Sequence, residues 1–311
     1  MRNTFVQTLC ELAEQDERIW LLCGDLGYSL LEGFARRFPE RFVNVGIAEQ
    51  NMVGIATGLS SCGKIVVIYS IANFPTLRCL EQIRNDICFH QANVKIVTVG
   101  GGFVYGTQGV THQVLEDLAI MRALPQMTVI APADAVETKV LTKVMMNLKG
   151  PSYLRLGRGG EAVLHSSDPL VNLGQMIPVK SGSEVLIIST GAILANVLEA
   201  AHQAQHKGHS PEVWSCPWLK PMDTKAIIQA AQEYRVIITV EEAQMSGGLG
   251  GAVAEIVSGL PSTRAVLRRL GVADCYLQEA YTQAAARAKV GLDVSSILQV
   301  IQESYAAKTK A

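Results

Sequence analysis

The sequence predicts an α/β protein made of two doubly wound domains. Continuously apolar segments such as Ile19–Cys23 alternate with segments of helical period, which is typical of parallel sheets that helices cover on both faces. The alternation occurs in two runs, separated by an irregular stretch over residues 157–178. A chain of 311 residues is also too long for one typical core. We therefore expect a first domain over residues 1–165, a linker over 166–182 and a second domain over 183–311.

The first run contains five expected strands, each a short apolar segment ended by a glycine, a proline or a polar residue. They cover residues 18–23, 64–69, 94–99, 127–130 and 152–156. The helical period predicts helices over 4–16, 30–38, 52–61, 76–90, 114–123 and 135–148. Pro39 ends the second of these helices. Asp134 is a good N-cap for the last one, because its carboxylate can accept from a free amide of the first turn.

The second run is expected to contain a smaller set of the same elements. Strands are expected over 184–189, 212–215, 235–240 and 263–267, and helices over 192–207, 223–233 and 252–258. The cluster Gly247–Gly251 opens the last helix. It lacks the spacing of known phosphate-binding loops, so close helix packing is a better interpretation than a phosphate cradle. The tail from Ala306 is expected to lie outside regular structure.

The composition is that of a globular enzyme and argues against several other classes. The net charge is −1 with no basic tract, which speaks against nucleic-acid binding. No apolar run reaches the ~18–20 residues of a membrane span, and no signal peptide precedes the first helical pattern. The seven cysteines form no CxxC pair. They indicate reduced core residues of a cytoplasmic protein, and neither a zinc site nor a disulfide framework.

The stretch Phe42–Asn51 combines an apolar run, a glycine and then a carboxylate, Glu49, at the start of a helix. That helix contains Gly54 and Gly58, and each interior glycine costs about 1 kcal/mol relative to alanine. Such a helix is expected where another helix or backbone packs closely against it. Spacing alone leaves two roles for Glu49: an acid in a site with little water, or a residue that complements the helix dipole.

Polar or aromatic side chains gather where loops leave the carboxyl ends of the expected strands, which is where doubly wound sheets bind ligands. They lie in Asp25–Ser29, Glu49–Asn51, Ser70–Phe74 and the loop 100–113. His112 in that loop is either a catalytic group or a hydrogen-bonding group at a helix end. Arg155 and Arg158 either hold a phosphate or pair with surface carboxylates, and surface pairing is favoured.

Several ordered motifs resemble those of transketolases, and together they cover nearly the whole chain. Val45–Gly54 is similar to the pyrimidine-binding motif of that family. The other matching segments are 81–87, 111–117, 132–137, 153–158, 241–244 and 247–250. The N-terminal half of the family, with its Gly-Asp-Gly diphosphate and magnesium motif, has no counterpart. The chain thus resembles the C-terminal subunit of a split transketolase, with a pyrimidine-binding domain followed by a C-terminal domain.

The resemblance implies thiamine diphosphate as cofactor. It also implies Mg²⁺ that is held mainly by a partner, the N-terminal transketolase subunit with the diphosphate-binding domain, in an α2β2 assembly; no metal ligand is expected in this chain. Glu49 would activate the aminopyrimidine of the cofactor, Phe74 would stack on that ring, and His112 would contact the substrate. Ile71 and Asp25 are expected at the edge of the cofactor.

The same resemblance points to a modified substrate site. Family members that use sugar phosphates hold the phosphate with an arginine, a serine, a histidine and a second arginine. The corresponding residues are Arg2, Ser29, Gly100 and Arg158, so the histidine is absent. Gln108 stands where an aspartate of the family reads a sugar hydroxyl. An amide donates as well as accepts hydrogen bonds, so we expect substrate recognition to differ.

The activity that the resemblance implies is ketol transfer, in which a two-carbon unit passes from a ketose or ketose phosphate to an acceptor. A 2-oxo acid decarboxylating subunit of the E1β type and a deoxyxylulose-phosphate synthase-like enzyme are alternatives within the same cofactor class. A non-catalytic paralogue is a third alternative, against which Glu49, Phe74 and His112 argue. A plain nucleotide-binding protein is the least supported, because no dinucleotide motif follows an expected strand.

Overall fold

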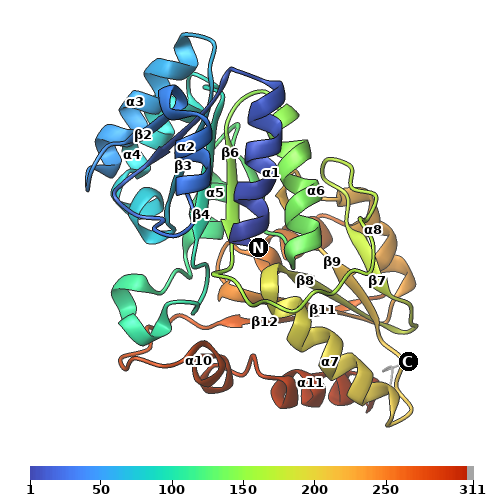
Figure 1. Cartoon of the computed structure of the whole chain (residues 1–311). Helices are drawn as coiled ribbons and strands as arrows, with labels where there is room; N and C mark the ends of the chain where they lie inside the picture. The colour runs from blue at the N-terminus through green and yellow to red at the C-terminus, as the bar shows by residue number, and fades with distance from the viewer. Residues whose placement is uncertain (307–311) are drawn as a thin grey trace.

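The computed structural model describes residues 1–306, and two sheets flanked by helices dominate it (Figure 1). The larger sheet has seven strands in the order β10-β5-β6-β4-β3-β1-β2. They are β1 (Ile19–Cys23), β2 (Phe42–Asn44), β3 (Ile65–Ile71), β4 (Val94–Val99), β5 (Thr128–Ile130), β6 (Ser152–Leu156) and β10 (Trp218–Lys220). Neighbouring strands are parallel except β10 and β5, which are antiparallel.

Helices cover both faces of this sheet. They are α1 (Arg2–Gln15), α2 (Glu32–Arg37), α3 (Glu49–Ser61), α4 (Leu80–Gln82), α5 (Asp117–Ala123) and α6 (Ala135–Asn147). Leu21 lies in one apolar cluster with Leu9 of α1, whereas its neighbour Leu22 lies in another with Met52 of α3. Because successive strand side chains point to opposite faces, a continuously apolar strand serves both helical layers, as expected from the sequence.

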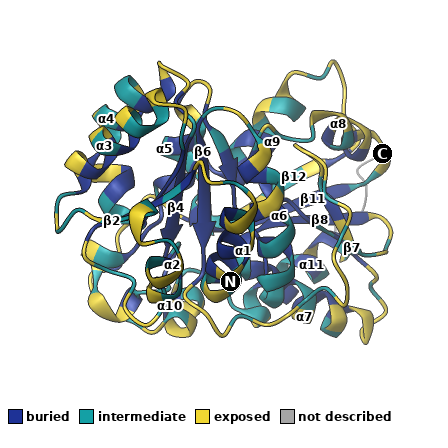
Figure 2. Ribbon diagram, turned by 45° about the horizontal axis from the view of Figure 1, so that its top comes forward, coloured by how far each residue is buried: buried dark blue, intermediate teal, exposed yellow. Residues whose placement is uncertain are grey.

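The smaller sheet has five strands in the order β12-β11-β8-β9-β7. They are β7 (Ile177–Lys180), β8 (Val185–Thr190), β9 (Glu212–Ser215), β11 (Val236–Gln244) and β12 (Val266–Val272). The helices around it are α7 (Leu194–Gln205), α8 (Thr224–Glu233), α9 (Leu249–Ser258), α10 (Gln283–Lys289) and α11 (Val294–Ala306). β7 runs antiparallel to β9, and the other neighbours are parallel. Most strands of both sheets are buried between helices, whereas the edge strands β2 and β12 are largely not (Figure 2).

The expected α/β fold is confirmed, but some elements differ from the expectation. The helix expected over 76–90 consists of two π-helical segments, η2 (Phe74–Arg78) and η3 (Ile83–Cys88), around the single turn of α4. The final strand, expected over 263–267, lies further along the chain as β12, because it runs through the charged pair at 268–269 and ends at Val272. The helix expected from residue 252 already begins at Leu249. The strands β7 and β10 and the helices α10 and α11 were not expected.

The two halves of the chain share a core. β10 belongs to the second half, yet it completes the edge of the first sheet by pairing Trp218 with Ile130. One apolar cluster contains Leu22 of the first sheet and Ile237 of the second. The expected boundaries, with a linker over 166–182, stay a prediction.

The glycines of α3 contact no other element of the described chain. Gly54 and Gly58 are exposed, and a Cβ at either position would have no neighbouring atom within 4 Å. No other element among residues 1–306 packs closely on them, so the expected close packing stays a prediction. Glu49 is nevertheless the first residue of α3 and buried, as expected. Asp134 caps α6 as expected, because its carboxylate accepts from the Glu137 amide at 2.8 Å.

The start of α9 shows the close packing that its glycines suggest. A Cβ at Gly247 would lie 2.9 Å from the Cβ of Ala119. The amides of Leu249 and Gly250 donate to the carboxylate of Glu241, at 2.7 and 2.8 Å. Since a carboxylate of the chain itself occupies this helix N-terminus, the packing interpretation is supported over a phosphate cradle.

The remaining general expectations concern cysteines, membranes and the C-terminus. Five cysteines are buried and two are exposed, and all seven are free thiols. Most of them are core residues, as expected. Within residues 1–306, no helix has the length and apolarity to cross a membrane; the cytoplasmic location stays a prediction. Ala306 ends α11, and the rest of the expected tail lies outside the described residues.

Candidate active site

The candidate site lies where the parallel strands of the first sheet end. Cys23 of β1 pairs with Tyr69 of β3, which in turn pairs with Val97 of β4, so the loops that follow these strands leave the sheet at one edge. Glu49 follows β2, Phe74 follows β3, and His112 lies in the long loop after β4. The structure thus brings these three expected site residues to one edge of the sheet, as the sequence predicts.

Glu49 is a buried carboxylate at the start of α3. Only 2% of the residue is exposed. Its Oε2 accepts a hydrogen bond from Nη1 of Arg78 at 2.8 Å, while Oε1 accepts none from the described residues. A Cβ at Gly24 would lie 3.7 Å from Glu49 Cγ and Oε1, so the glycine after β1 leaves room around the carboxylate. Sequence reasoning did not identify Arg78, the partner of this carboxylate.

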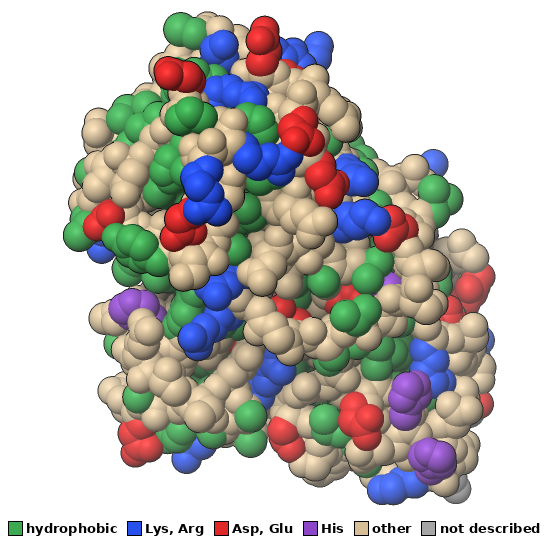
Figure 3. Space-filling model, viewed as in Figure 1, with side chains coloured by type: hydrophobic (Ala, Val, Ile, Leu, Met, Phe, Trp, Pro, Cys, Tyr) green, Lys and Arg blue, Asp and Glu red, His purple; other side chains and the backbone are tan. Residues whose placement is uncertain are grey.

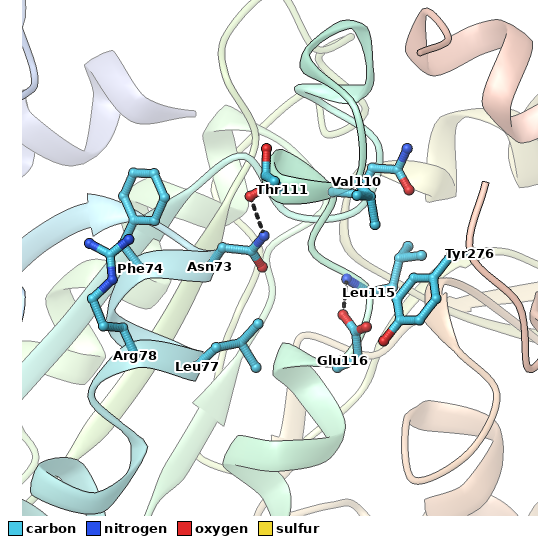
Figure 4. A pocket seen from close by; sticks show the side chains of 10 residues that line it. Asn73, Phe74, Leu77, Arg78, Val110, Thr111, Leu115, Glu116 and Tyr276 are labelled. Atoms are coloured by element: carbon cyan, nitrogen blue, oxygen red, sulfur yellow. Dashed lines mark hydrogen bonds between the residues drawn. The ribbon is translucent and has the colours of Figure 1, made fainter. Parts of the chain in front are cut away.

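Phe74, Arg78 and His112 form a contiguous group beside Glu49. The guanidinium carbon of Arg78 lies 4.9 Å from the centroid of the Phe74 ring. The rings of Phe74 and His112 meet edge to face, with centroids 5.7 Å apart. The loop that carries His112 is fastened to β3 by Asn73, whose side-chain amide donates to the Thr111 carbonyl at 2.7 Å (Figure 4).

A cavity of about 630 Å³ opens beside this group, within the usual size range of small-molecule sites. Its lining includes Phe74, Arg78 and Glu116 from the first half of the chain and Tyr276 from the second (Figure 4). The buried side chain of Gln113 also lines it, and neither polar atom of that amide has a hydrogen-bond partner among residues 1–306. Unpartnered buried amides are costly, so this lining fits a ligand that carries polar groups.

Three consecutive glycines after β4 each make room for a side chain. A Cβ at Gly100 would lie 2.3 Å from the ring of Tyr105. A Cβ at Gly101 would lie 2.2 Å from Arg155 Nε. The third, Gly102, accommodates the carboxylate of Glu242. The glycine run was seen in the sequence, but nothing in it says which side chains fill the spaces.

Arg155 differs from both of its expected roles. It is buried and forms an ion pair with buried Asp117, with 2.9 Å between Nε and Oδ2. Its Nη2 also donates to the carbonyls of Val114 and Glu242, at 2.7 and 3.0 Å. Burial raises the pKa of the Asp117 carboxyl, and the nearby Arg155 opposes that rise. Arg155 therefore pairs with a buried carboxylate, whereas the sequence favoured a surface one.

The expected substrate residue Arg2 lies near Gly159, the residue that follows the second expected arginine, Arg158. A Cβ at Gly159 would be 3.9 Å from Arg2 Nε, and the guanidinium of Arg158 lies 5.8 Å from the Tyr105 ring centroid. Neither arginine has a carboxylate partner among residues 1–306. Burial raises the pKa of Tyr69 nearby, Tyr105 adds to the rise and Arg2 opposes it. Lys and Arg side chains also gather near the middle of the face in Figure 3.

The other expected residues lie around this edge. Asp25 and Ser29 follow β1, are exposed, and both have positive φ. Asp25 Oδ1 accepts from the Tyr28 hydroxyl at 3.0 Å. Ile71 ends β3, and Gln108 is exposed at the end of the short helix η4 (Gly106–Gln108). No contact joins Asp25, Ser29 or Gln108 directly to Glu49 in the described chain.

Two family models match the chain in order. Residues 1–160 match the transketolase pyrimidine binding domain, and residues 174–297 match the transketolase C-terminal domain.

The chain belongs to the transketolase family.

Similar proteins agree with this assignment. The chain is 36% identical over 306 residues to a putative transketolase C-terminal section of Methanocaldococcus jannaschii, covering 97% of this chain and 95% of that one. It is 38% identical over 275 residues to one of the subunits of the apulose-4-phosphate transketolase of Phocaeicola vulgatus, covering 88% and 87%. It is 33% identical over 304 residues to a 6-deoxy-6-sulfo-D-fructose transketolase subunit of Clostridium sp., covering 97% and 94%.

Solved structures show the same relation. A split gene transketolase, described as an inactive β4 tetramer, superposes with a TM-score of 0.90 at 37% identity, covering 99% of this chain and 98% of that chain. The transketolase of Campylobacter jejuni shares the fold, with a TM-score of 0.81 at 19% identity, and this chain covers 46% of it. The interpretation as the C-terminal subunit of a split transketolase is thus confirmed.

Proposed function

We propose that this transketolase-family chain is one half of a two-component, thiamine diphosphate-dependent enzyme that transfers a two-carbon ketol unit. A partner subunit with the diphosphate-binding domain would complete the site. The observation that carries the proposal is the convergence of Glu49, Phe74 and His112 at one edge of the sheet, beside a cavity of about 630 Å³. Relatives whose names mark them as a C-terminal section or as a single subunit support the split arrangement.

The residues at the site fit the aminopyrimidine of thiamine diphosphate. Glu49 offers a buried carboxylate for a ring nitrogen, and Phe74 offers an apolar face. Thiamine diphosphate supplies, when bound, a thiazolium carbon at which a carbon–carbon bond next to a ketone is cleaved. Ile71 and Asp25 would lie at the edge of the cofactor. The diphosphate and Mg²⁺ would be held mainly by the partner, and no group of three or more His, Cys, Asp or Glu side chains within residues 1–306 is arranged for a metal.

Glu49 would act by holding and moving a proton at the pyrimidine nitrogen. Because Glu49 is buried, the proton would be exchanged between its carboxyl group and the ring, and not with solvent. His112 would contact the substrate from its position beside Phe74, whose ring it meets edge to face. The Thr111 hydroxyl lies 2.9 Å from His112 Nδ1 and orients the imidazole. Gln108 would contact a hydroxyl of the substrate.

The substrate class we propose is a ketose with an anionic end group, such as a sugar phosphate. Arg2 and Arg158 supply two positive charges without carboxylate partners in the described chain. Ser29 would contribute a hydroxyl at the same end. The ring of Tyr105 packs against Gly100, in the space that a histidine side chain at position 100 would need. Two relatives are named for a phosphate and a sulfo sugar, which agrees with an anionic end group.

The expected assembly is α2β2. The exposed glycine face of α3 would pack against another subunit, since Gly54 and Gly58 contact nothing in the described chain. Ile47, two residues before Glu49, is 79% exposed and would be covered by the same contact. A related chain is known as an inactive β4 tetramer, which supports a requirement for the partner.

The proposal is tested by mixing the chain with the diphosphate-domain subunit of the same organism. Ketol transfer from a ketose phosphate donor to an aldose phosphate acceptor should require both subunits, thiamine diphosphate and Mg²⁺. Omission of any one of the four is the control. Loss of thiamine diphosphate binding by the mixture would instead favour a non-catalytic paralogue.

A second candidate is a 2-oxo acid donor with decarboxylation. It is favoured by 34% identity over 309 residues to a 1-deoxy-D-xylulose-5-phosphate synthase of Geobacter sulfurreducens, of which this chain spans about half (48%). The same mixture should then release carbon dioxide from pyruvate. Carbon dioxide release without ketol transfer would replace the proposed activity with this one.

A further inference from the structure

Arg78 makes the two contacts that the proposed function assigns to the aminopyrimidine. Its Nη1 donates to Glu49 Oε2 at 2.8 Å, as a pyrimidine that carries a proton on its ring nitrogen would at this carboxylate. Its guanidinium carbon lies 4.9 Å from the Phe74 centroid, where a stacked ring would lie. A guanidinium is planar, carries N–H donors and stacks on aromatic faces, so it reproduces both features of the pyrimidine.

The backbone of Arg78 is anchored, whereas its side chain makes few contacts. Phe74 and Arg78 begin and end the π-helical segment η2, whose wide turn places one above the other. The Arg78 carbonyl accepts from the side chain of Gln50 on α3 at 3.1 Å, so the backbone is fastened beside Glu49. Beyond the ion pair and the ring contact, the guanidinium has no other partner in the described chain.

Burial is unequal across this pair. Glu49 is 2% exposed, whereas half of the Arg78 side chain is exposed and lines the cavity beside Phe74 (Figure 4). The arginine can therefore leave toward the cavity without unfolding of the site. The carboxylate cannot follow it, and would then be buried without a partner unless another donor takes the vacated place.

We propose that Arg78 belongs to the cofactor site and is the side chain that thiamine diphosphate displaces from Glu49 and Phe74. It closes the pyrimidine site of the empty subunit, and the cofactor binds only to the fraction of molecules in which the guanidinium has moved away. The inference rests on the proposed function, because it takes Glu49 and Phe74 as the contacts of the pyrimidine. It follows that the apparent cofactor affinity equals the intrinsic affinity multiplied by the fraction of open sites.

Two variants test the proposal in the complex with the partner subunit. Arg78→Met keeps the length of the side chain and removes the charge and the donors. Isothermal titration of thiamine diphosphate with Mg²⁺ should show about three- to tenfold tighter binding than to the unmodified complex, as expected for one partly exposed ion pair with a ring contact. Arg84→Met, on the adjacent segment and exposed, is the matched control and should bind as the unmodified complex does.

A second measurement needs no cofactor. The Glu49–Arg78 contact should appear as coupling in a double-mutant cycle of thermal unfolding of the isolated chain, with Glu49→Gln, Arg78→Met and the double variant. In the titration, Arg78→Met in the Glu49→Gln background should no longer tighten cofactor binding. Additive melting temperatures would overturn the closed pair.

The outcomes separate this inference from the proposed function. If the unmodified complex binds thiamine diphosphate and Arg78→Met weakens that binding, the arginine holds the cofactor and the displacement is wrong, while the proposed function stands. Unchanged affinity in Arg78→Met also overturns the displacement. If neither complex binds the cofactor, both the proposed function and this inference fail.

Discussion

Replacing Gly100 with alanine is expected to push the Tyr105 ring from its place. An ideal Cβ at Gly100 would lie 2.3 Å from both Cδ2 and Cε2 of that ring. Carbon atoms pack at about 3.5–4.0 Å, so the ring must retreat by more than about 1 Å. The backbone at Gly100 also has a φ of +92°. Left-handed backbone costs about 1–2 kcal/mol and overpacking adds about 1–3 kcal/mol, so Gly100→Ala should lose about 2–5 kcal/mol of unfolding free energy.

Gly109 in the same loop provides the matched control. Its φ is +79°, but a Cβ there would meet no atom within 4 Å. Gly109→Ala should therefore lose only its backbone cost, about 1–3 kcal/mol for a φ of +79° with a ψ of −170°. Urea unfolding of the isolated chain, followed by circular dichroism, measures both losses. Gly100→Ala should lose about 1–3 kcal/mol less in the Tyr105→Ala background than in the unmodified chain, and equal losses in the two backgrounds would refute the steric reasoning.

Three further predictions concern stability. The hydrogen bond to Glu137 raises the pKa of His165. This pair therefore stabilises the fold fully below about pH 6.5, and its contribution is lost as the pH rises through the raised pKa. His165→Gln should remove that pH dependence from the urea midpoints. Burial lowers the pKa of Lys95 from 10.5 to about 7. Between these two pH values the unfolded chain binds one proton more than the folded chain, so the unfolding free energy should rise with pH. Lys95→Met should not show this rise. Arg155→Met leaves Asp117 buried without its cation and should cost about 3–5 kcal/mol in the same assay, and a cost under 1 kcal/mol would contradict a buried pair.

The sequence was sufficient for the elements that bear the site. β4 was expected over the residues that form it, because a short segment rich in β-branched residues ends at a run of glycines. The rule that ligands bind at the carboxyl ends of parallel strands correctly grouped Glu49, Phe74 and His112. These predictions succeeded because local pattern and sheet topology determine them.

Features that depend on contacts between distant residues could not be predicted. β10 has three residues, too few for a period, and its place on the first sheet comes from pairing with Ile130. A π-helical segment of five residues is too short to show a period of its own, so η2 was expected as part of an ordinary helix, and the alignment of Arg78 with Phe74 was missed. An arginine four residues after an expected stacking aromatic was the signal available in the sequence.

Ketol transfer by the reconstituted complex, with Glu49 and with Glu49→Gln, shows whether this carboxylate activates the cofactor. Glu49→Gln keeps the size of the side chain but cannot hold or release the proton at the pyrimidine. Turnover should fall by about 10²–10⁴-fold, while thiamine diphosphate binding and the size of the complex are retained. Glu17→Gln, an exposed carboxylate outside the site, should leave turnover unchanged. Full turnover in Glu49→Gln would contradict the account.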